Sequence, residues 1–200
     1  MVFKPPNGWS LIQSRDGIFP SSVEIWAIES NFRQFSTTDL LKIRMEHEEI
    51  DMSIEKDEWG KPTLATREWS FNGSHSEGIS LLAVSRSKSI GIDVENAAPR
   101  FPVSRIIERF FSDSEKRFIG ELPTNMRDRT FFRFWASKEA VIKAVPIGSE
   151  ISVDSVVIEL SNDDTLQLSA NSKIREYSNK LQLFELDLFR PFVGCLAIEE

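Results

Sequence analysis

The sequence contains a single cysteine and no long apolar run. The cysteine, Cys195, excludes an internal disulfide framework and fits a reducing compartment. Because Cys195 lies in an apolar stretch, we expect a buried structural thiol rather than a nucleophile. No apolar run approaches the roughly 18 residues that cross a bilayer, and the segment Lys4–Asn7 is unlike the apolar part of a signal peptide. We therefore expect a cytoplasmic protein with no membrane partner.

Excess positive charge is also lacking, since the net charge is −7 over 200 residues. That balance argues against a general nucleic-acid-binding protein. Residues 100–143 are the exception, with ten basic and six acidic side chains. A locally positive segment in an acidic protein predicts an anionic ligand or an acidic protein partner. Charges that only solvate helix faces would leave the same pattern, so both interpretations stay open.

Apolar residues are plentiful, and their spacing predicts both strands and helices. They make up 40% of the chain and include fifteen Phe and five Trp, enough for a sizeable core. Residues 1–20 are expected to be irregular. Extended, β-branched or alternating patterns predict strands at 23–28, 69–72, 79–85, 89–95, 151–160, 165–170, 182–188 and 192–198. Helical spacing predicts helices at 38–49, 103–111, 112–122 and 127–145, the third of which begins with a capping box.

The order of strands, helices and strands favours an α+β fold over alternating βαβ units. We expect two similar α+β halves, each a mostly antiparallel sheet with helices packed on it. Their joint is expected near Asn96–Arg100, which gives an N-terminal half at 1–98 and a C-terminal half at 99–200.

The helix predicted at 127–145 carries a polar stripe on an otherwise apolar surface. Trp135, Glu139 and Lys143 are spaced at i, i+4 and i+8, so they share one face. A surface salt bridge between Glu139 and Lys143, worth about 0.3 kcal/mol, would explain the pair without any function. A functional interpretation needs a second acidic group near this face.

Asp93 and Glu95 supply such a group. Side chains two apart in a strand project to the same side, so both carboxylates share one face of the strand predicted at 89–95. Two adjacent carboxylates repel each other unless a cation joins them, and a divalent ion with oxygen ligands, such as magnesium, would do so. A solvent-exposed strand face remains the alternative.

Of two polar stretches in the first half, one could contact a phosphate and the other carries a single lysine. Gly73–Ser76 is predicted to be a loop whose backbone N–H groups can hold an anion, with His75 in it. A lone histidine is more often a structural residue, so this interpretation stays open. Asp57–Pro62 is predicted to be a turn that carries Lys61.

Five stretches occur together in a specific order. They are Trp59–Pro62 (WGKP), Phe71–Ser76 (FNGSHS), Ile90–Glu95 (IGIDVE), Arg109–Glu115 (RFFSDSE) and Phe134–Lys143 (FWASKEAVIK). With these motifs the chain resembles the 4′-phosphopantetheinyl transferases of the monomeric, two-halved Sfp type. The resemblance covers residues 59–143, and the strands predicted after residue 150 suit the rest of the second half.

The resemblance implies magnesium-dependent transfer of 4′-phosphopantetheine from coenzyme A, the co-substrate, to a serine of an apo acyl or peptidyl carrier protein, with release of 3′,5′-ADP. It also implies a monomer with one site between its halves. By motif, Asp93, Glu95 and Glu139 match the magnesium ligands. Glu139 also matches the general base, and Lys143 matches the lysine that binds the pyrophosphate and protonates the leaving phosphate. Matches to coenzyme A contacts, or neighbours of such matches, are Lys61, Ser74, His75, Lys138 and Lys143. The carrier proteins of this family are acidic, which suits the positive segment 100–143.

The first half departs from the family pattern because it is short and Glu46–Glu58 is largely acidic. The family has basic residues in this region that contact the 3′-phosphate of coenzyme A, and no residue of this sequence matches them well. Arg33 and Arg44 are weak matches. Two other hypotheses stay open: a non-catalytic relative that binds coenzyme A or a carrier protein without turnover, and a plain α+β domain with accidental matches. The active enzyme is favoured because all four matched acidic and lysine residues are present: Asp93, Glu95, Glu139 and Lys143.

Overall fold

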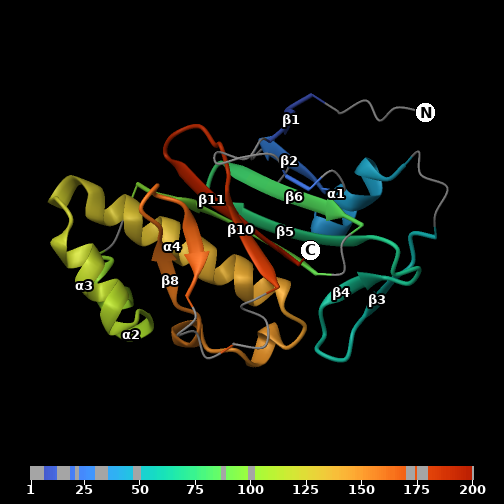
Figure 1. The fold of residues 1–200 in the computed structure, drawn as a ribbon. Coiled ribbons are helices and arrows are strands. Elements are labelled where there is room, and N and C mark those ends of the chain that lie inside the picture. Colours follow the sequence, from blue (N-terminus) through green and yellow to red (C-terminus); the bar gives the residue numbers. More distant parts are fainter. Residues whose placement is uncertain are drawn as a thin grey trace.

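The structure is a computed structural model that describes residues 7–12, 19–20, 23–29, 36–46, 51–86, 89–98, 102–169, 174 and 180–199. Strands and helices combine in an α+β fold, as predicted (Figure 1). The strands are β1 (Trp9–Leu11), β2 (Val23–Glu29), β3 (Ile54–Lys56), β4 (Pro62–Leu64), β5 (Ser70–Ser76), β6 (Ile79–Ser85), β7 (Ile90–Asn96), β8 (Ile158–Leu160), β9 (Leu166–Leu168), β10 (Leu181–Glu185) and β11 (Phe192–Glu199). The helices are α1 (Thr37–Arg44), α2 (Ser104–Phe110), α3 (Asp113–Glu121) and α4 (Thr124–Ala144), with short 3₁₀ turns at Gly148–Glu150 and Val153–Ser155.

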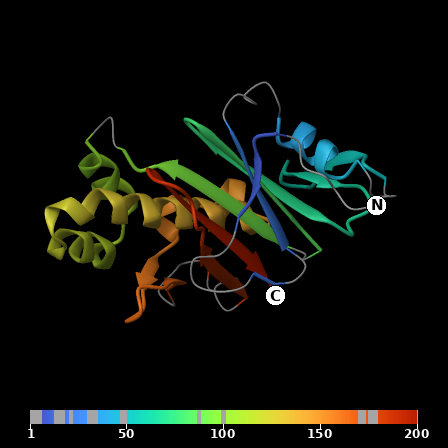
Figure 2. The same ribbon diagram turned by 90° about the horizontal axis from the view of Figure 1, so that it is seen from above.

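Two antiparallel sheets form the centre of the molecule. The first has the strand order β1-β2-β6-β5 and the second β10-β11-β7. An apolar layer lies between them, with Ile25 and Leu81 from the first sheet and Ile92 and Leu196 from the second. Helix α1 packs Leu41 on the other face of the first sheet, and α4 covers the other face of the second, so the two helices lie on opposite sides (Figure 2).

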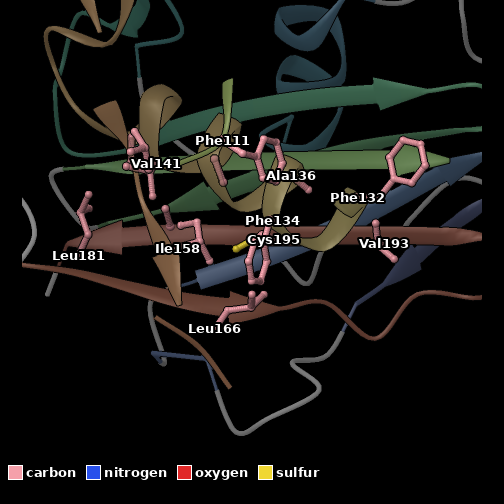
Figure 3. Packing of buried hydrophobic residues seen from close by; sticks show 14 of the residues in the cluster. Phe111, Phe132, Phe134, Ala136, Val141, Ile158, Leu166, Leu181, Val193 and Cys195 are labelled. Carbon is pink, nitrogen blue, oxygen red and sulfur yellow. The ribbon is translucent and has the colours of Figure 1, made fainter. Parts of the chain in front are cut away.

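Helix α4 packs directly on β7 and β11. Figure 3 shows Phe134 and Val141 of this helix in the same apolar cluster as Cys195 of β11. The close approach depends on Gly91 in β7, because a Cβ there would lie 2.1 Å from the carbonyl oxygen of Ala140. A glycine inside a strand is typical of such a close backbone approach. Cys195 is free and buried, which confirms the predicted structural thiol.

Strands β5 and β7 lie side by side and join the two sheets along what we call the seam. Alternate side chains of β5 accept hydrogen bonds from backbone amides of β7, and both strands run in the same direction. The bonds are Ile92 N to Asn72 Oδ1 (3.0 Å), Val94 N to Ser74 Oγ (3.3 Å) and Asn96 N to Ser76 Oγ (3.0 Å). Because residues two apart share one side of a strand, the polar residues at 72, 74 and 76 all face β7.

Several predicted elements differ from the observed ones. Strand β1 lies within residues 1–20, which were expected to be irregular, and Gly73–Ser76 belongs to β5 rather than to a loop. The helix expected at 38–49 ends at Arg44, and the strand expected at 151–160 begins only at Ile158. Within the described ranges, no helix is long and apolar enough to cross a membrane.

Strand β6 belongs to the first sheet and β7 to the second. The chain therefore passes from one sheet to the other before it reaches the joint expected near Asn96–Arg100. Strand β7 pairs with β11, where Asp93 lies opposite Cys195. The organisation into two similar halves, with a boundary at 98/99, stays a prediction.

Candidate active site

Asp93 lies in the middle of β7 at the seam, and its side chain is almost completely buried. Its Oδ1 accepts hydrogen bonds from Lys143 Nζ (2.7 Å) and Ser74 Oγ (2.7 Å). Its Oδ2 is buried and has no hydrogen-bond partner among the described residues. Burial raises the pKa of Asp93, and the contact with Lys143 opposes that shift. An enclosed carboxylate oxygen without a donor marks a position where a further positive group would be stabilised.

Lys143 reaches this position from the last turn of α4. Besides its bond to Asp93, its Nζ donates to the backbone oxygen of Ile92 (3.2 Å). The ammonium spans the short distance between helix and strand because Gly91 brings the two backbones together. Its side chain keeps 28% of its surface exposed.

Glu95 and Glu139 complete an acidic cluster around Asp93. The pKa of Glu95 is raised to about 7 by burial and by the nearby charges of Asp93 and Glu139, while a hydrogen bond with Trp135 works in the opposite direction. Burial and the charge of Asp93 also raise the pKa of Glu139, and Lys143 lowers it. The contact between Lys143 and Asp93 shows that the polar side of β7 faces the polar stripe of α4.

The chemistry of this cluster fits a hard divalent cation. It offers carboxylate oxygens only, one of them buried without a partner at Asp93, and such ligands suit magnesium. Across the described part of the chain, however, no three His, Cys, Asp or Glu side chains converge closely enough to form a metal site as they stand. The ligand set Asp93, Glu95 and Glu139 therefore remains a prediction.

Ser74 and His75 lie in β5, beside the cluster. The Ser74 hydroxyl is shared between Asp93 and the amide of Val94, so it also ties the seam together. His75 is exposed. Both residues line a cavity of about 470 Å³ that also borders Ser36 at the start of α1. This cavity is open to a ligand, although the backbone there is a strand and not the expected loop.

Lys61 lies in the predicted turn between β3 and β4, and its side chain is directed into the protein. Its Nζ donates to the backbone oxygens of Lys143 (2.5 Å) and Ile90 (3.3 Å). Burial lowers the pKa of Lys61, an effect that Asp57 partly offsets.

Lys138 does not reach the acidic cluster, and its burial contradicts the predicted contact with coenzyme A. The side chain is completely buried, with Nζ 2.9 Å from Glu115 Oε1 and bonded to the backbone oxygen of Val156. Glu115 in turn accepts from the amides of Ser112 (2.7 Å) and Ile158 (2.9 Å). An ammonium enclosed in this way ties α3, α4 and β8 together and has no surface for a ligand.

Of the two weak matches for the 3′-phosphate, Arg44 is already paired within the protein. Arg44 is buried and bidentate to Glu24, with bonds of 2.6 and 2.7 Å. A guanidinium held in this way is committed to its carboxylate. Arg33 lies outside the described residues.

Comparison with known proteins decides the family. A sequence model of the 4′-phosphopantetheinyl transferase superfamily matches residues 89–196, which is more than half of the chain. The chain belongs to this superfamily. The match includes Asp93, Glu95, Glu139 and Lys143 and confirms the resemblance seen in the motifs.

Individual members of the superfamily are similar over part of their length. The 4′-phosphopantetheinyl transferase HetI of Nostoc sp. is 38% identical over 93 residues, 44% of this chain and 39% of the relative. The 4′-phosphopantetheinyl transferase gsp of Aneurinibacillus migulanus is 29% identical over 144 residues, 72% of this chain and 57% of the relative. The 4′-phosphopantetheinyl transferase Sfp of Bacillus subtilis is 30% identical over 120 residues, 59% of this chain and 52% of the relative. The chain thus spans about 40–60% of these relatives.

A solved structure of Helicobacter pylori holo-[acyl-carrier-protein] synthase in complex with coenzyme A is 24% identical, with a TM-score of 0.44 over 56% of this chain and 99% of that one.

Some residues at the site of this transferase-superfamily member were missed by sequence reasoning. Asn72 and Ser76 bind β7 backbone amides, and Ser89 bonds the backbone oxygen of Ala144. The alternating polar residues at 72, 74 and 76 were a signal for a strand with one polar side, but the glycine and serines around His75 suggested a loop. Ser89 carried no signal, because its partner lies 55 residues away.

Proposed function

We propose that this protein transfers 4′-phosphopantetheine from coenzyme A to a serine hydroxyl of an apo acyl or peptidyl carrier protein, in a magnesium-dependent reaction that releases 3′,5′-ADP. The observation that carries the proposal is the contact between Lys143 and Asp93 at 2.7 Å, inside a cluster completed by Glu95 and Glu139. A cation next to several carboxylates suits a site for a metal-bound pyrophosphate. Membership of the superfamily supports the same reaction.

The residues take complementary parts in this proposal. Magnesium held by Asp93, Glu95 and Glu139 would neutralise and orient the pyrophosphate. The serine oxygen of the carrier protein bonds to the phosphorus that bears pantetheine, and the bond to the 3′,5′-ADP oxygen breaks. Glu139 accepts the serine proton, directly or through a water. Lys143 donates a proton to the departing phosphate oxygen.

Coenzyme A would lie along the seam. Ser74 and His75 line the cavity next to α1, which suits the phosphates of the nucleotide. Lys143 is accessible enough to reach the pyrophosphate. Lys61 contacts the same end of α4 through the backbone oxygen of Lys143.

The carrier protein would dock on the segment 100–143, in which basic side chains outnumber acidic ones. Arg105, Arg109, Arg117 and Arg127 are exposed on α2, α3 and the first turns of α4. An acidic partner would be attracted to this surface and oriented by it. A monomer acting in the cytoplasm belongs to the same proposal.

A non-catalytic relative that binds coenzyme A or a carrier protein without turnover is the second candidate. It is favoured by Arg44, which pairs with Glu24 and so does not supply the basic contact expected for the 3′-phosphate.

Mass spectrometry of the carrier protein distinguishes the two functions. The protein is mixed with coenzyme A, magnesium and several apo carrier proteins, and an active transferase adds one phosphopantetheine group to at least one of them. Calorimetry with coenzyme A and with each apo carrier protein runs in parallel. Binding of coenzyme A or of a carrier protein without any adduct would favour the non-catalytic relative, and neither binding nor adduct would reject both.

A further inference from the structure

The C-terminal end of α4 is held by side chains from two distant segments. A helix leaves its last carbonyls without intrahelical partners, and here two of them accept bonds from elsewhere in the chain. Lys61 Nζ donates to the oxygen of Lys143 at 2.5 Å, and Ser89 Oγ donates to the oxygen of Ala144. A lysine at this end is also favoured by the helix dipole.

Lys61 connects three elements at once. Its Nζ reaches Ile90 at the start of β7 as well as the end of α4. Its own backbone is anchored, because its amide donates to Asp57 Oδ1 (2.8 Å) and its carbonyl accepts from the amide of Asp57 (3.0 Å). The turn at Trp59 is fastened to the same oxygen (2.9 Å). The ammonium is therefore presented from a fixed support.

The end of α4 carries Lys143, which is held both at its backbone carbonyl and at its side-chain ammonium. Its carbonyl is held by Lys61, and its ammonium is held by Asp93. Gly91 sets how near the helix comes to β7, since its missing Cβ would collide with Ala140. The bonds from Lys61 oppose movement in the other direction, away from the strand.

We propose that Lys61 is a positioning residue, which clamps the end of α4 to β7 and so keeps Lys143 within reach of Asp93, instead of contacting coenzyme A. This inference rests on the proposed transferase function. An ammonium that contacts nucleotide would turn toward solvent, whereas here it lies against two backbone oxygens of the protein. The clamp comprises Lys61 and Ser89.

A positioning role and a contact to coenzyme A predict different kinetics for Lys61→Met. This substitution keeps the aliphatic part of the side chain and removes the ammonium donor. A positioning residue lowers kcat by about tenfold or more, because small displacements of reacting groups are costly, and leaves KM for coenzyme A within about twofold. A contact to coenzyme A raises KM and the calorimetric Kd instead. Lys56→Met is the matched control, because Lys56 is exposed in the neighbouring strand β3.

Hydrogen exchange tests the clamp without any activity. Loss of the clamp should speed exchange of the amides at residues 143–145 by about tenfold, because the end of the helix opens more often. Ser89→Ala should act in the same direction, and it serves as the deciding variant if Lys61→Met does not fold. Lys56→Met should leave these amides unchanged.

The outcomes separate the inference from the proposed function. Unchanged exchange in both Lys61→Met and Ser89→Ala overturns the clamp, even if the parent protein modifies carriers. A raised KM and Kd for coenzyme A with unaltered kcat and exchange also overturns it. A parent protein that modifies no carrier defeats the transferase proposal, while faster exchange in the variants would still support the clamp.

Discussion

Lys143 and Asp93, 50 residues apart in the chain, meet where α4 crosses β7, with Nζ 2.7 Å from Oδ1. The pair brings a cation to an almost buried carboxylate whose other oxygen lacks a partner among the described residues. Three features make the meeting possible: the bare backbone of Gly91, the bonds of Lys61 to the helix end and the seam between β5 and β7. The predictions below test these features and the chemistry proposed for them.

Glu139→Gln should lower carrier modification by at least about 100-fold, in the range expected for loss of a general base. The fold should be retained, because Glu139 is half-buried near the like charge of Asp93 and a neutral amide relieves that repulsion. Carrier mass spectrometry and thermal unfolding measure the two effects. Glu68→Gln, at an exposed position, is the control, and full activity in Glu139→Gln would remove Glu139 from the mechanism.

Gly91→Ala should destabilise the protein by at least about 2 kcal/mol, because overpacking forces backbone apart and the new Cβ would lie 2.1 Å from the oxygen of Ala140. It should also abolish transfer by moving Lys143 away from Asp93. Gly120→Ala is the matched control: nothing lies within 4 Å of a Cβ there, so this helix substitution should stabilise by about 0.5 kcal/mol. Urea unfolding reports both values, and equal stabilities would contradict the close packing.

Lys138→Met should cost about 3–5 kcal/mol of stability, because it leaves Glu115 as an unpaired buried charge in a pair that is 0% exposed on both sides. The double variant Lys138→Met/Glu115→Gln should lose less stability than the sum of the losses in the two single variants. Denaturant unfolding of the parent protein, both single variants and the double variant gives the coupling energy. If Lys138→Met weakened coenzyme A binding with no loss of stability, the structural assignment of Lys138 would have to be abandoned.

The Cys195 thiol should resist alkylating and disulfide reagents at pH 8 in the folded protein and react at once in denaturant. Burial raises the pKa of Cys195 from 9.0 to about 12, so little thiolate forms in the folded state. Because the folded pKa is the higher one, this group favours the folded state fully below pH 9 and progressively less between pH 9 and 12. Rapid labelling of the folded protein at pH 8, measured by absorbance, would contradict this burial.

Local pattern predicted much of the fold. The strands near 23–28 and 79–85, the capping box of α3 and the long helix α4 occur as expected. Each depends on periodicity and caps within a short stretch of chain. The prediction of a loop at Gly73–Ser76, which belongs to β5, was wrong. The polar composition of this stretch is typical of a loop, but the polar side chains of β5 bond to β7, about 20 residues later.

The sequence alone determined which side chains share a face: Asp93 with Glu95 on a strand, and Trp135, Glu139 and Lys143 on a helix. Strand and helix periods follow from backbone geometry, so neighbours in the chain are sufficient to set them. Only the tertiary structure decided what the long basic side chains touch. It enclosed Lys138 against Glu115, 23 residues away, paired Arg44 with Glu24, and turned Lys61 toward a helix end 82 residues away. Such contacts depend on how separate elements approach one another, and no local pattern records that approach.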